Sequence, residues 1–250
     1  MSDTLEVSNA RTNRLMSCCR SLLTFVEDDD DYDYDNNVAA KVKGLPKESV
    51  RDIVFLDDST VLTLVDMLLE KKDYKRATLV SLLYDCGSRK NEIAQVEKDS
   101  FYDEKKNLTN KLVGKRGKTY RAVYHSLTKK CAKLYLAERG EDDVPQLFIT
   151  QGGEAADAQN LYDWIVSLRP MVEQITGKPS DLNVHSFRHS FIQNLSDGTH
   201  YLCREGNLGK VPLDKIKILV NHSDLSTTDS YRKDTSIEEI GELFNIDMNE

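Results

Sequence analysis

The sequence predicts a mostly helical (α+β) fold that carries one small antiparallel β-sheet. Apolar residues recur at helical spacing through most of the chain from about residue 55 onward. One stretch, residues 108–125, instead alternates like two strands that flank a turn containing glycine. An apolar content of 39% and a charged content of 30% are typical of a globular protein. A chain of 250 residues can form one large domain with a smaller piece beside it.

The N-terminal part differs from the rest. Residues 9–26 have the period of an amphipathic helix, and their apolar stripe consists of Leu15, Cys19, Leu22, Leu23 and Val26. One helix cannot bury this stripe alone, so it must pack on the following domain, on a partner or on sequence upstream. Residues 27–35 (EDDDDYDYD) then carry seven carboxylates and no base. Because like charges repel, we expect an extended acidic linker over residues 28–50.

Most of the remaining elements are expected to be helices. The expected helices cover residues 58–69, 75–84, 126–137, 160–175, 185–195, 213–220, 226–231 and 236–244. The second of them should end at Gly87, and a short new helix should begin near Arg89. Residues 92–101 are expected to lead into an extended piece, residues 147–150 are expected to be extended, and residues 198–209 are expected to form a loop.

The charge is unevenly distributed along the chain. The net charge is −8, but it would be −1 without the acidic stretch. Residues 105–133 contain ten Lys or Arg and no Asp or Glu, and they include the predicted strands 108–114 and 119–125. Affinity for DNA depends on the local basic face more than on the global sign. We therefore expect this hairpin to contact DNA, through Lys111, Arg116, Lys118 and Arg121.

Nothing in the sequence indicates a secreted or membrane protein. No apolar run approaches the roughly 18 residues that a membrane-spanning helix needs. Residues 1–15 are polar, unlike a signal peptide. The five cysteines are odd in number and lack paired metal spacing, which argues for reduced thiols. We expect a cytoplasmic, nucleoid-associated location.

Three polar motifs concentrate the residue types that phosphate chemistry needs. They are the first motif, residues 86–93 (CGSRKNEI, with Arg89 and Glu92), the second motif, residues 184–191 (VHSFRHSF, with His185 and Arg188), and the third motif, residues 221–231 (NHSDLSTTDSY, with His222 and Tyr231). Arginine suits the charged transition state of phosphodiester exchange, because its planar fork gives bidentate hydrogen bonds and stays protonated. The attacking hydroxyl needs a proton acceptor, and the leaving oxygen needs a proton donor.

A zinc site is an alternative for part of this set. His185 and His189 lie four residues apart on a predicted helix, a spacing that can bind zinc. No third ligand stands near them at a standard spacing, so we favour the phosphate interpretation and expect His189 to pack or cap nearby.

Together these motifs resemble those of the tyrosine recombinase (phage integrase) family. The family patterns T-G-L-R-x-S-E-L, H-x-L-R-H-T and L-G-H-S-x-I-x-T-T-x-x-Y correspond to residues 86–93, 185–190 and 220–231. The hairpin sequence from Val113 to Arg121 resembles the V-G-K turn of the family. The resemblance runs from about residue 55 to the C-terminus. Asn221 departs from it, because the family usually has glycine before the histidine.

The resemblance implies site-specific DNA recombination or integration, by cleavage and rejoining through a 3′-phosphotyrosyl intermediate without metal, ATP or another cofactor. Tyr231 would be the nucleophile. Lys115 would protonate the leaving 5′ oxygen, with Lys118 as the alternative lysine. Arg89 and Arg188 would clamp the phosphate, and His222 would donate a hydrogen bond to it. His185 would exchange a proton with the tyrosine. Glu92 would orient the cationic side chains.

The resemblance also implies a domain organisation and partners. Residues 51–235 would be the tyrosine-recombinase-like catalytic domain, residues 1–27 the last helix of a core-binding domain, and residues 236–250 a tail that either packs on its own chain or is exchanged between protomers. With the core-binding domain nearly absent, this chain alone should bind DNA weakly. The expected partners are double-stranded DNA with specific recombination sites, further copies in a tetramer, and accessory DNA-bending or directionality factors, with no membrane involved.

Two other functions use similar residues. A type IB topoisomerase or a hairpin-resolving enzyme would have the same pocket in a different assembly. A non-catalytic, regulatory DNA-binding relative would not need the full set of residues, and the presence of that set argues against it.

Overall fold

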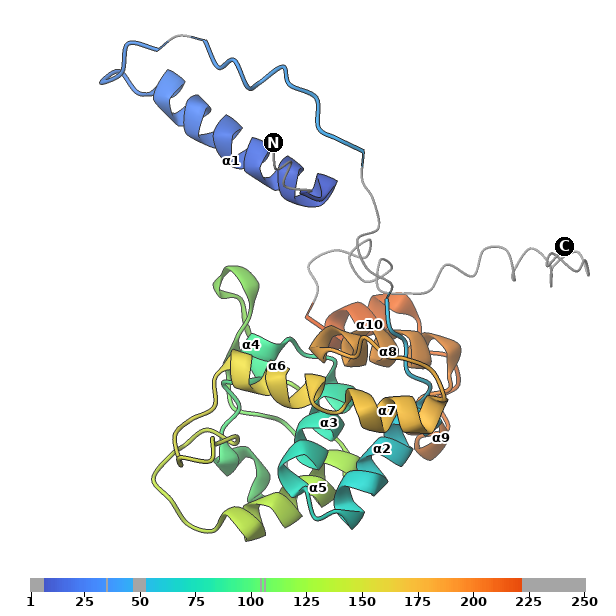
Figure 1. The fold of residues 1–250 in the computed structure, drawn as a ribbon. Coiled ribbons are helices and arrows are strands. Elements are labelled where there is room, and N and C mark those ends of the chain that lie inside the picture. Colours follow the sequence, from blue (N-terminus) through green and yellow to red (C-terminus); the bar gives the residue numbers. More distant parts are fainter. Residues whose placement is uncertain (1–6, 35, 47–52, 104, 106, 222–250) are drawn as a thin grey trace, which may run out of the picture. The chain divides into compact units, whose positions relative to one another are not determined.

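The computed structural model describes residues 7–34, 36–46, 53–103, 105 and 107–221. The predicted helices at 226–231 and 236–244 lie outside these residues. The chain forms two compact units, residues 1–52 and 53–250, each of which is described by itself. As predicted, the fold is mostly helical with one small, two-stranded antiparallel sheet (Figure 1). None of the helices in the described part is long and apolar enough to span a membrane.

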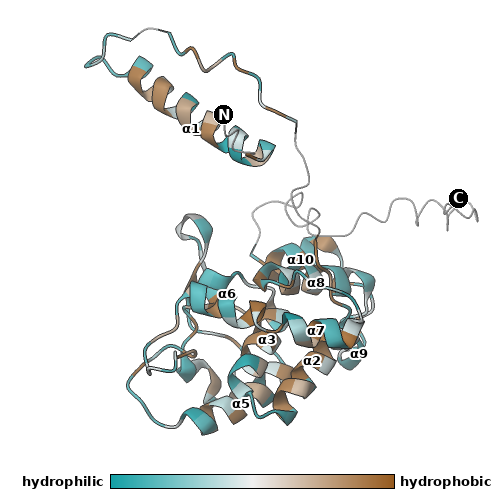
Figure 2. Cartoon of the chain, in the orientation of Figure 1, coloured by the Kyte–Doolittle hydropathy of each residue, from teal (hydrophilic) through white to brown (hydrophobic). Residues whose placement is uncertain are grey.

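The first unit consists of one helix and a segment that returns along it. Helix α1 (Asn9–Asp28) confirms the predicted N-terminal helix, and none of its side chains is buried. Leu15, Leu22 and Phe25 of this helix are exposed, and Figure 2 shows hydrophobic residues along its length. Residues 36–46 run back along α1, where Asn13 Nδ2 donates to Leu45 O (2.9 Å) and Asn13 Oδ1 accepts from Leu45 N (2.7 Å). This part of the expected linker is therefore folded back on the helix.

The second unit is built around a central helix. α2 (Asp58–Glu70) and α3 (Tyr74–Cys86) form where their apolar spacing predicts them. All ten residues of α3 from 77 to 86 are buried, as expected of a helix that other elements surround. Helices α2, α5 and α8 pack against it (Figure 1). The helix ends at Gly87, as predicted, because this residue adopts a left-handed conformation (φ 57°).

The other elements surround this centre. They are α4 (Lys90–Ile93), η1 (Lys98–Phe101), η2 (Lys115–Gly117), α5 (Ser126–Arg139), α6 (Ala158–Val166), α7 (Arg169–Thr176), α8 (Val184–Asp197), α9 (Tyr201–Glu205) and α10 (Leu213–Leu219). The predicted hairpin is present, although its strands are short. β1 (Leu112–Val113) pairs with β2 (Thr119–Tyr120), so that Leu112 lies opposite Tyr120.

The expectation of one helix over residues 160–175 was wrong. The helix is interrupted between α6 and α7, just before Pro170, which occupies the first turn of α7. Proline has no N–H to donate, so a helix continuing through residue 170 would lose its hydrogen bond to Val166 O, whereas the first turn of a helix tolerates proline. It therefore ends the first helix and starts the second.

Residues 92–101 contain the end of α4 and all of η1, and the hairpin follows them. One expectation of irregular structure was wrong. The expected loop 198–209 contains α9, which begins where the His200 ring accepts a hydrogen bond from Leu202 N (3.2 Å). Burial of His200 and Tyr201 holds this short helix against the core.

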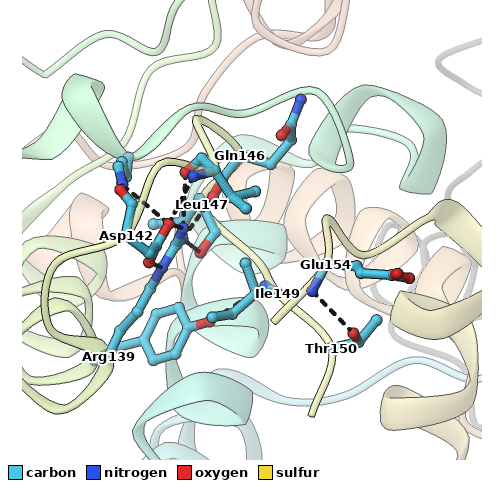
Figure 3. A network of polar contacts seen from close by, with 10 residues as sticks. Arg139, Asp142, Gln146, Leu147, Ile149, Thr150 and Glu154 are labelled. Carbon is cyan, nitrogen blue, oxygen red and sulfur yellow. Dashed lines mark hydrogen bonds and ion pairs between the residues drawn. The ribbon is translucent and has the colours of Figure 1, made fainter. Parts of the chain in front are cut away.

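A buried arginine orders the chain after α5. The Arg139 side chain is fully buried and pairs with Asp142. It also donates to the carbonyl oxygens of Val144 (2.8 Å) and Leu147 (2.9 Å) (Figure 3). Lys98 Nζ approaches the same Asp142 carboxylate at 3.1 Å. These bonds hold residues 140–147, which belong to none of the helices or strands, in one conformation.

A buried carboxylate connects α2, α3 and α9. Asp58 Oδ1 accepts hydrogen bonds from the Tyr84 hydroxyl (2.8 Å) and from Tyr201 N (2.8 Å). Its other oxygen pairs with Arg204. These bonds fix the C-terminal half of α3, which leads directly into the first motif.

We predict that Asp58→Ala lowers the free energy of unfolding by about 2–4 kcal/mol, because it leaves buried donors without an acceptor. The neighbouring Asp57→Ala is the control, since Asp57 is exposed and its side chain does not cap α2. It should change stability by less than about 1 kcal/mol. Urea denaturation of the two variants measures the difference, and equal losses would contradict this role of Asp58.

Candidate active site

The first motif holds an arginine and a glutamate in a fixed relation. Arg89 precedes α4, and Glu92 Oε2 accepts a hydrogen bond from Arg89 N (2.7 Å). Glu92 Oε1 lies 3.1 Å from Arg89 Nη1. The Glu92 side chain is 2% exposed, whereas that of Arg89 is 25% exposed. The carboxylate therefore orients a guanidinium that is still accessible to an anion.

The second motif contributes a buried arginine that contacts two other segments. Arg188 on α8 is 1% exposed. Its guanidinium donates to Gly87 O in the first motif and to Val220 O (2.9 Å), just before the third motif. One side chain therefore ties together three parts of the chain that are far apart in sequence.

His185 lies one helical turn before Arg188, at the start of α8. The Asn183 side chain caps this helix by accepting from His185 N (2.9 Å). The residue keeps solvent access. Partial burial of the ring lowers the pKa of His185, and the positive charges of Arg188, Arg89 and Lys90 lower it further. The imidazole is therefore neutral near pH 7 and can accept a proton.

The hairpin lies against the first motif. The Tyr120 hydroxyl donates to Glu92 Oε2 (2.8 Å) and lies 3.0 Å from Ser88 Oγ. Gly114 is also close to Glu92, because a Cβ built on this glycine would stand 3.2 Å from Glu92 Oε1. The exposed Lys115 follows Gly114 directly. The turn that carries the predicted catalytic lysine is thus beside the Arg89–Glu92 pair.

The first residue of the third motif, Asn221, lies beside Gly114 of the hairpin. Asn221 has a positive φ of 52°, and its Nδ2 would lie 3.2 Å from a Cβ on Gly114. A left-handed conformation is easiest for glycine and tolerated by asparagine, which accounts for asparagine at the position where the family usually has glycine. His222 and Tyr231 lie outside the described residues.

The predicted DNA-binding residues lie on or beside the hairpin. Lys111 and Lys118 are exposed, and Lys118 lies just after η2. Arg121 is exposed as well, and its Nη1 donates to Thr109 O (2.9 Å). The Arg116 side chain lies outside what the structure describes.

His189 contacts an aromatic ring and does not belong to a metal cluster. Its ring makes an edge contact with Phe55, at 5.7 Å between centroids. Within the described residues, no group of three or more His, Cys, Asp or Glu side chains is placed to hold a metal ion.

Tyr120 and Ser88 belong to this site but were not among the predicted site residues. Strand alternation gives a signal for Tyr120, because it shares a face with the buried Ala122 and Tyr124. Nothing in the sequence shows that its hydroxyl would reach Glu92.

The described residues thus gather two guanidinium groups, a neutral imidazole and an exposed lysine turn. Such a set suits a phosphodiester, whose oxygens accept hydrogen bonds and whose displacement needs proton transfer.

Comparison with known proteins places the chain in a family. The sequence model described as "Phage integrase family" matches residues 54–237. Tyrosine recombinase XerC of Caldanaerobacter subterraneus subsp. tengcongensis is 27% identical over 195 residues, which cover 74% of this chain and 49% of that protein. Tyrosine recombinase XerD of Corynebacterium glutamicum is 26% identical over 165 residues, which cover 64% and 48%. The chain therefore spans about half the length of the curated relatives it matches.

Solved structures show the same fold at low identity. The XerH site-specific recombinase, in a post-cleavage complex with a palindromic difH substrate, has a TM-score of 0.68 and 18% identity, covering 97% of this chain and 67% of that one. The Tn1549 transposon integrase, in complex with circular intermediate DNA, has a TM-score of 0.66 and 14% identity, covering 96% and 80%.

Gly87→Ala should test how tightly the site is packed. Gly87 and Gly177 both end helices with a positive φ, of 57° and 69°. A Cβ on Gly87 would lie only 2.5 Å from Phe191 Cδ1, whereas a Cβ on Gly177 would meet no atom within 4 Å. Both alanine variants should therefore lose about 1 kcal/mol of stability from backbone strain. Only Gly87→Ala should lose a further 1–3 kcal/mol or so from overpacking, as measured by urea denaturation. Equal losses would show that the site tolerates a methyl group here.

Proposed function

Because the chain belongs to the phage integrase family, we propose that it takes part in site-specific DNA recombination as a tyrosine-type DNA strand transferase. The observation that carries the proposal is the convergence of Arg89, Arg188 and His185. His185 and Arg188 lie one turn apart on α8, and Arg188 donates to Gly87 O, two residues before Arg89. Partial burial, and then the positive charges of Arg188, Arg89 and Lys90, lower the pKa of His185. Two fixed cations beside a neutral base are what metal-independent phosphoryl transfer requires.

In the proposed first step, the Tyr231 oxygen attacks the scissile phosphorus and forms a 3′-phosphotyrosyl ester. The bond from phosphorus to the 5′ oxygen breaks. His185 accepts the tyrosine proton, and Lys115 donates a proton to the leaving 5′ oxygen, with Lys118 on the same turn as the alternative. The energy of the phosphodiester is kept in the ester, so rejoining to a second 5′ hydroxyl is the reverse reaction and uses neither ATP nor a metal.

The remaining groups would stabilise the extra negative charge of the transition state. Arg89, oriented by Glu92, is accessible to a phosphate as it stands. Arg188 is buried, so DNA binding must expose one edge of its guanidinium before it can contact the phosphate. His222 would add a hydrogen bond to a phosphate oxygen.

The proposed partner is double-stranded DNA with specific recombination sites. The exposed Lys111 and Lys118, with Arg116 and Arg121, would contact its backbone beside the cleaved phosphate. Strand exchange between two sites requires four active sites, so we infer a tetramer on DNA, assisted by accessory DNA-bending or directionality factors. The protein would then be associated with the nucleoid.

Assembly would use the C-terminal tail, residues 236–250. A cavity of about 470 Å³ opens between α8, α9 and α10. Its apolar lining includes Phe191, Leu195, Leu202, Leu208, Val211 and Leu219. The apolar stripe of the tail, with Ile237, Ile240, Leu243 and Phe244, has the chemistry to fill such a cavity on a neighbouring protomer.

A nicked suicide substrate tests the function. After cleavage it loses the short fragment that carries the freed 5′ hydroxyl, so rejoining cannot occur and the intermediate is trapped. We expect the protein to form a covalent DNA adduct in EDTA, and Tyr231→Phe to form none, since it lacks the attacking oxygen. Tyr102→Phe is the control, because Tyr102 is 60% exposed and lies outside the site. Denaturing gel electrophoresis detects the adduct.

An adduct that persists in Tyr231→Phe, or that requires a divalent metal, would contradict the mechanism. Relaxation of supercoiled DNA without sequence preference would favour a type IB topoisomerase. Resolution of hairpin ends would favour a hairpin-resolving enzyme. Specific DNA binding without any adduct would favour a non-catalytic, regulatory relative.

A further inference from the structure

The hydroxyl of Tyr120 joins the hairpin to the first motif. We propose that Tyr120 is a positioning residue, which acts through Glu92 to hold the lysine turn of the hairpin beside the Arg89 guanidinium, so that the lysine faces the phosphate that Arg89 contacts. The inference rests on the proposed strand transfer and adds a residue to it.

Glu92 is the point where these contacts meet. Its Oε2 accepts hydrogen bonds from the Tyr120 hydroxyl (2.8 Å) and from Arg89 N (2.7 Å). Its Oε1 accepts from Arg89 Nη1 (3.1 Å). The carboxylate is therefore shared between the hairpin and the arginine, and it is 2% exposed. A buried carboxylate with fixed donors cannot move without breaking hydrogen bonds to a charged group.

The hairpin needs such an attachment. Next to the turn, its regular ladder consists of two residue pairs, Leu112 with Tyr120 and Val113 with Thr119, and the two segments meet again further away at the Leu108–Val123 bridge. A short two-stranded hairpin is marginally stable by itself. The side chain of Gln95 holds β1, through hydrogen bonds to Val113 N (2.8 Å) and Val113 O (3.1 Å). The phenol of Tyr120 holds β2, so the two attachments fix the turn from both sides.

The surroundings of Tyr120 keep its hydroxyl protonated, so that it can donate a hydrogen bond to Glu92. Burial raises the pKa of Tyr120, and the negative charge of Glu92 raises it further. The hydroxyl therefore stays protonated throughout the pH range in which recombination would operate. Ser88 Oγ, 3.0 Å away, contributes a further polar contact from the first motif.

The turn held in this way places lysine close to the arginine. Gly114 also lies close to Glu92, and a Cβ at this position would stand 3.2 Å from Glu92 Oε1, Asn221 Nδ2 and Lys118 O, which is tighter than an ordinary contact. Lys115 follows it directly. A shift of about 1 Å in this turn is enough to misplace a proton donor.

Tyr120→Phe tests the inference on two DNA substrates. One is the normal suicide substrate, and the other has sulfur in place of the 5′ bridging oxygen, which leaves as a thiolate without a donated proton. We expect Tyr120→Phe to cleave the normal substrate at least about 10-fold more slowly, a part of the roughly 10²- to 10⁴-fold that proton transfer contributes. On the sulfur substrate we expect its rate to return to within about 3-fold of wild type, because misplacement of lysine no longer matters there.

The matched control is Tyr124→Phe. It removes another phenol from the same segment, whose hydroxyl donates to Ser100 O, away from the site. This variant should cleave both substrates like wild type. In the absence of DNA, hydrogen exchange of the Gly114 amide, which donates to Lys118 O (2.8 Å), should become about 10-fold faster in Tyr120→Phe and stay unchanged in Tyr124→Phe.

Each outcome separates the inference from the proposed function. If wild type forms no Tyr231-dependent adduct, the function is wrong and the inference falls with it. If wild type forms the adduct and Tyr120→Phe cleaves the normal substrate at the same rate, only the inference is overturned. A deficit that is equal on both substrates, or that Tyr124→Phe shares, would show a general structural role and would also overturn it.

Discussion

The arrangement of the site depends on the buried guanidinium of Arg188. It takes Gly87 O and Val220 O as acceptors and so joins the end of α3, the middle of α8 and the end of α10. A guanidinium has several donors in a rigid plane, which lets one side chain bridge carbonyl groups on different elements. A buried charge without such acceptors would be costly, so these contacts are as strongly required as the packing around them.

Other features of the domain support this junction. Gly87 leaves no room for a side chain beside Phe191, so α3 and α8 approach closely at the point where Arg188 crosses between them. Asp58, with Tyr84 and Tyr201, fixes the preceding turns of α3. Beyond Gly87, the Glu92 carboxylate accepts hydrogen bonds from Arg89 and from Tyr120 of the hairpin, so both are held beside the same junction. In the proposed strand transfer, the protein itself thus orients Arg89, which would lower the cost of stabilising a charged transition state, whereas Arg188 would still have to expose one edge of its guanidinium.

Much of this could be predicted from the sequence, for reasons that are local. The end of α3 at Gly87 and the hairpin around residues 115–118 follow from turn chemistry, and α8 follows from its apolar spacing. The break before Pro170 was also visible in the sequence and was missed, because the apolar stripe continues across it. The hydrogen bonds of Arg188 and Tyr120 could not be predicted. The partners of Arg188 lie 101 and 32 residues away in sequence and that of Tyr120 lies 28 residues away, and only the packed fold brings them together.

The most direct test of this account is the stability of Arg188→Lys in the absence of DNA. Lysine keeps the charge but cannot place planar donors on two carbonyl groups at once. We expect urea denaturation to show a loss of at least about 2 kcal/mol, because buried carbonyls lose their donor. Arg89→Lys, at a side chain that is 25% exposed, should lose less than about 1 kcal/mol. A stability of Arg188→Lys within about 0.5 kcal/mol of wild type would contradict the account, since Arg188 would then not hold the site together.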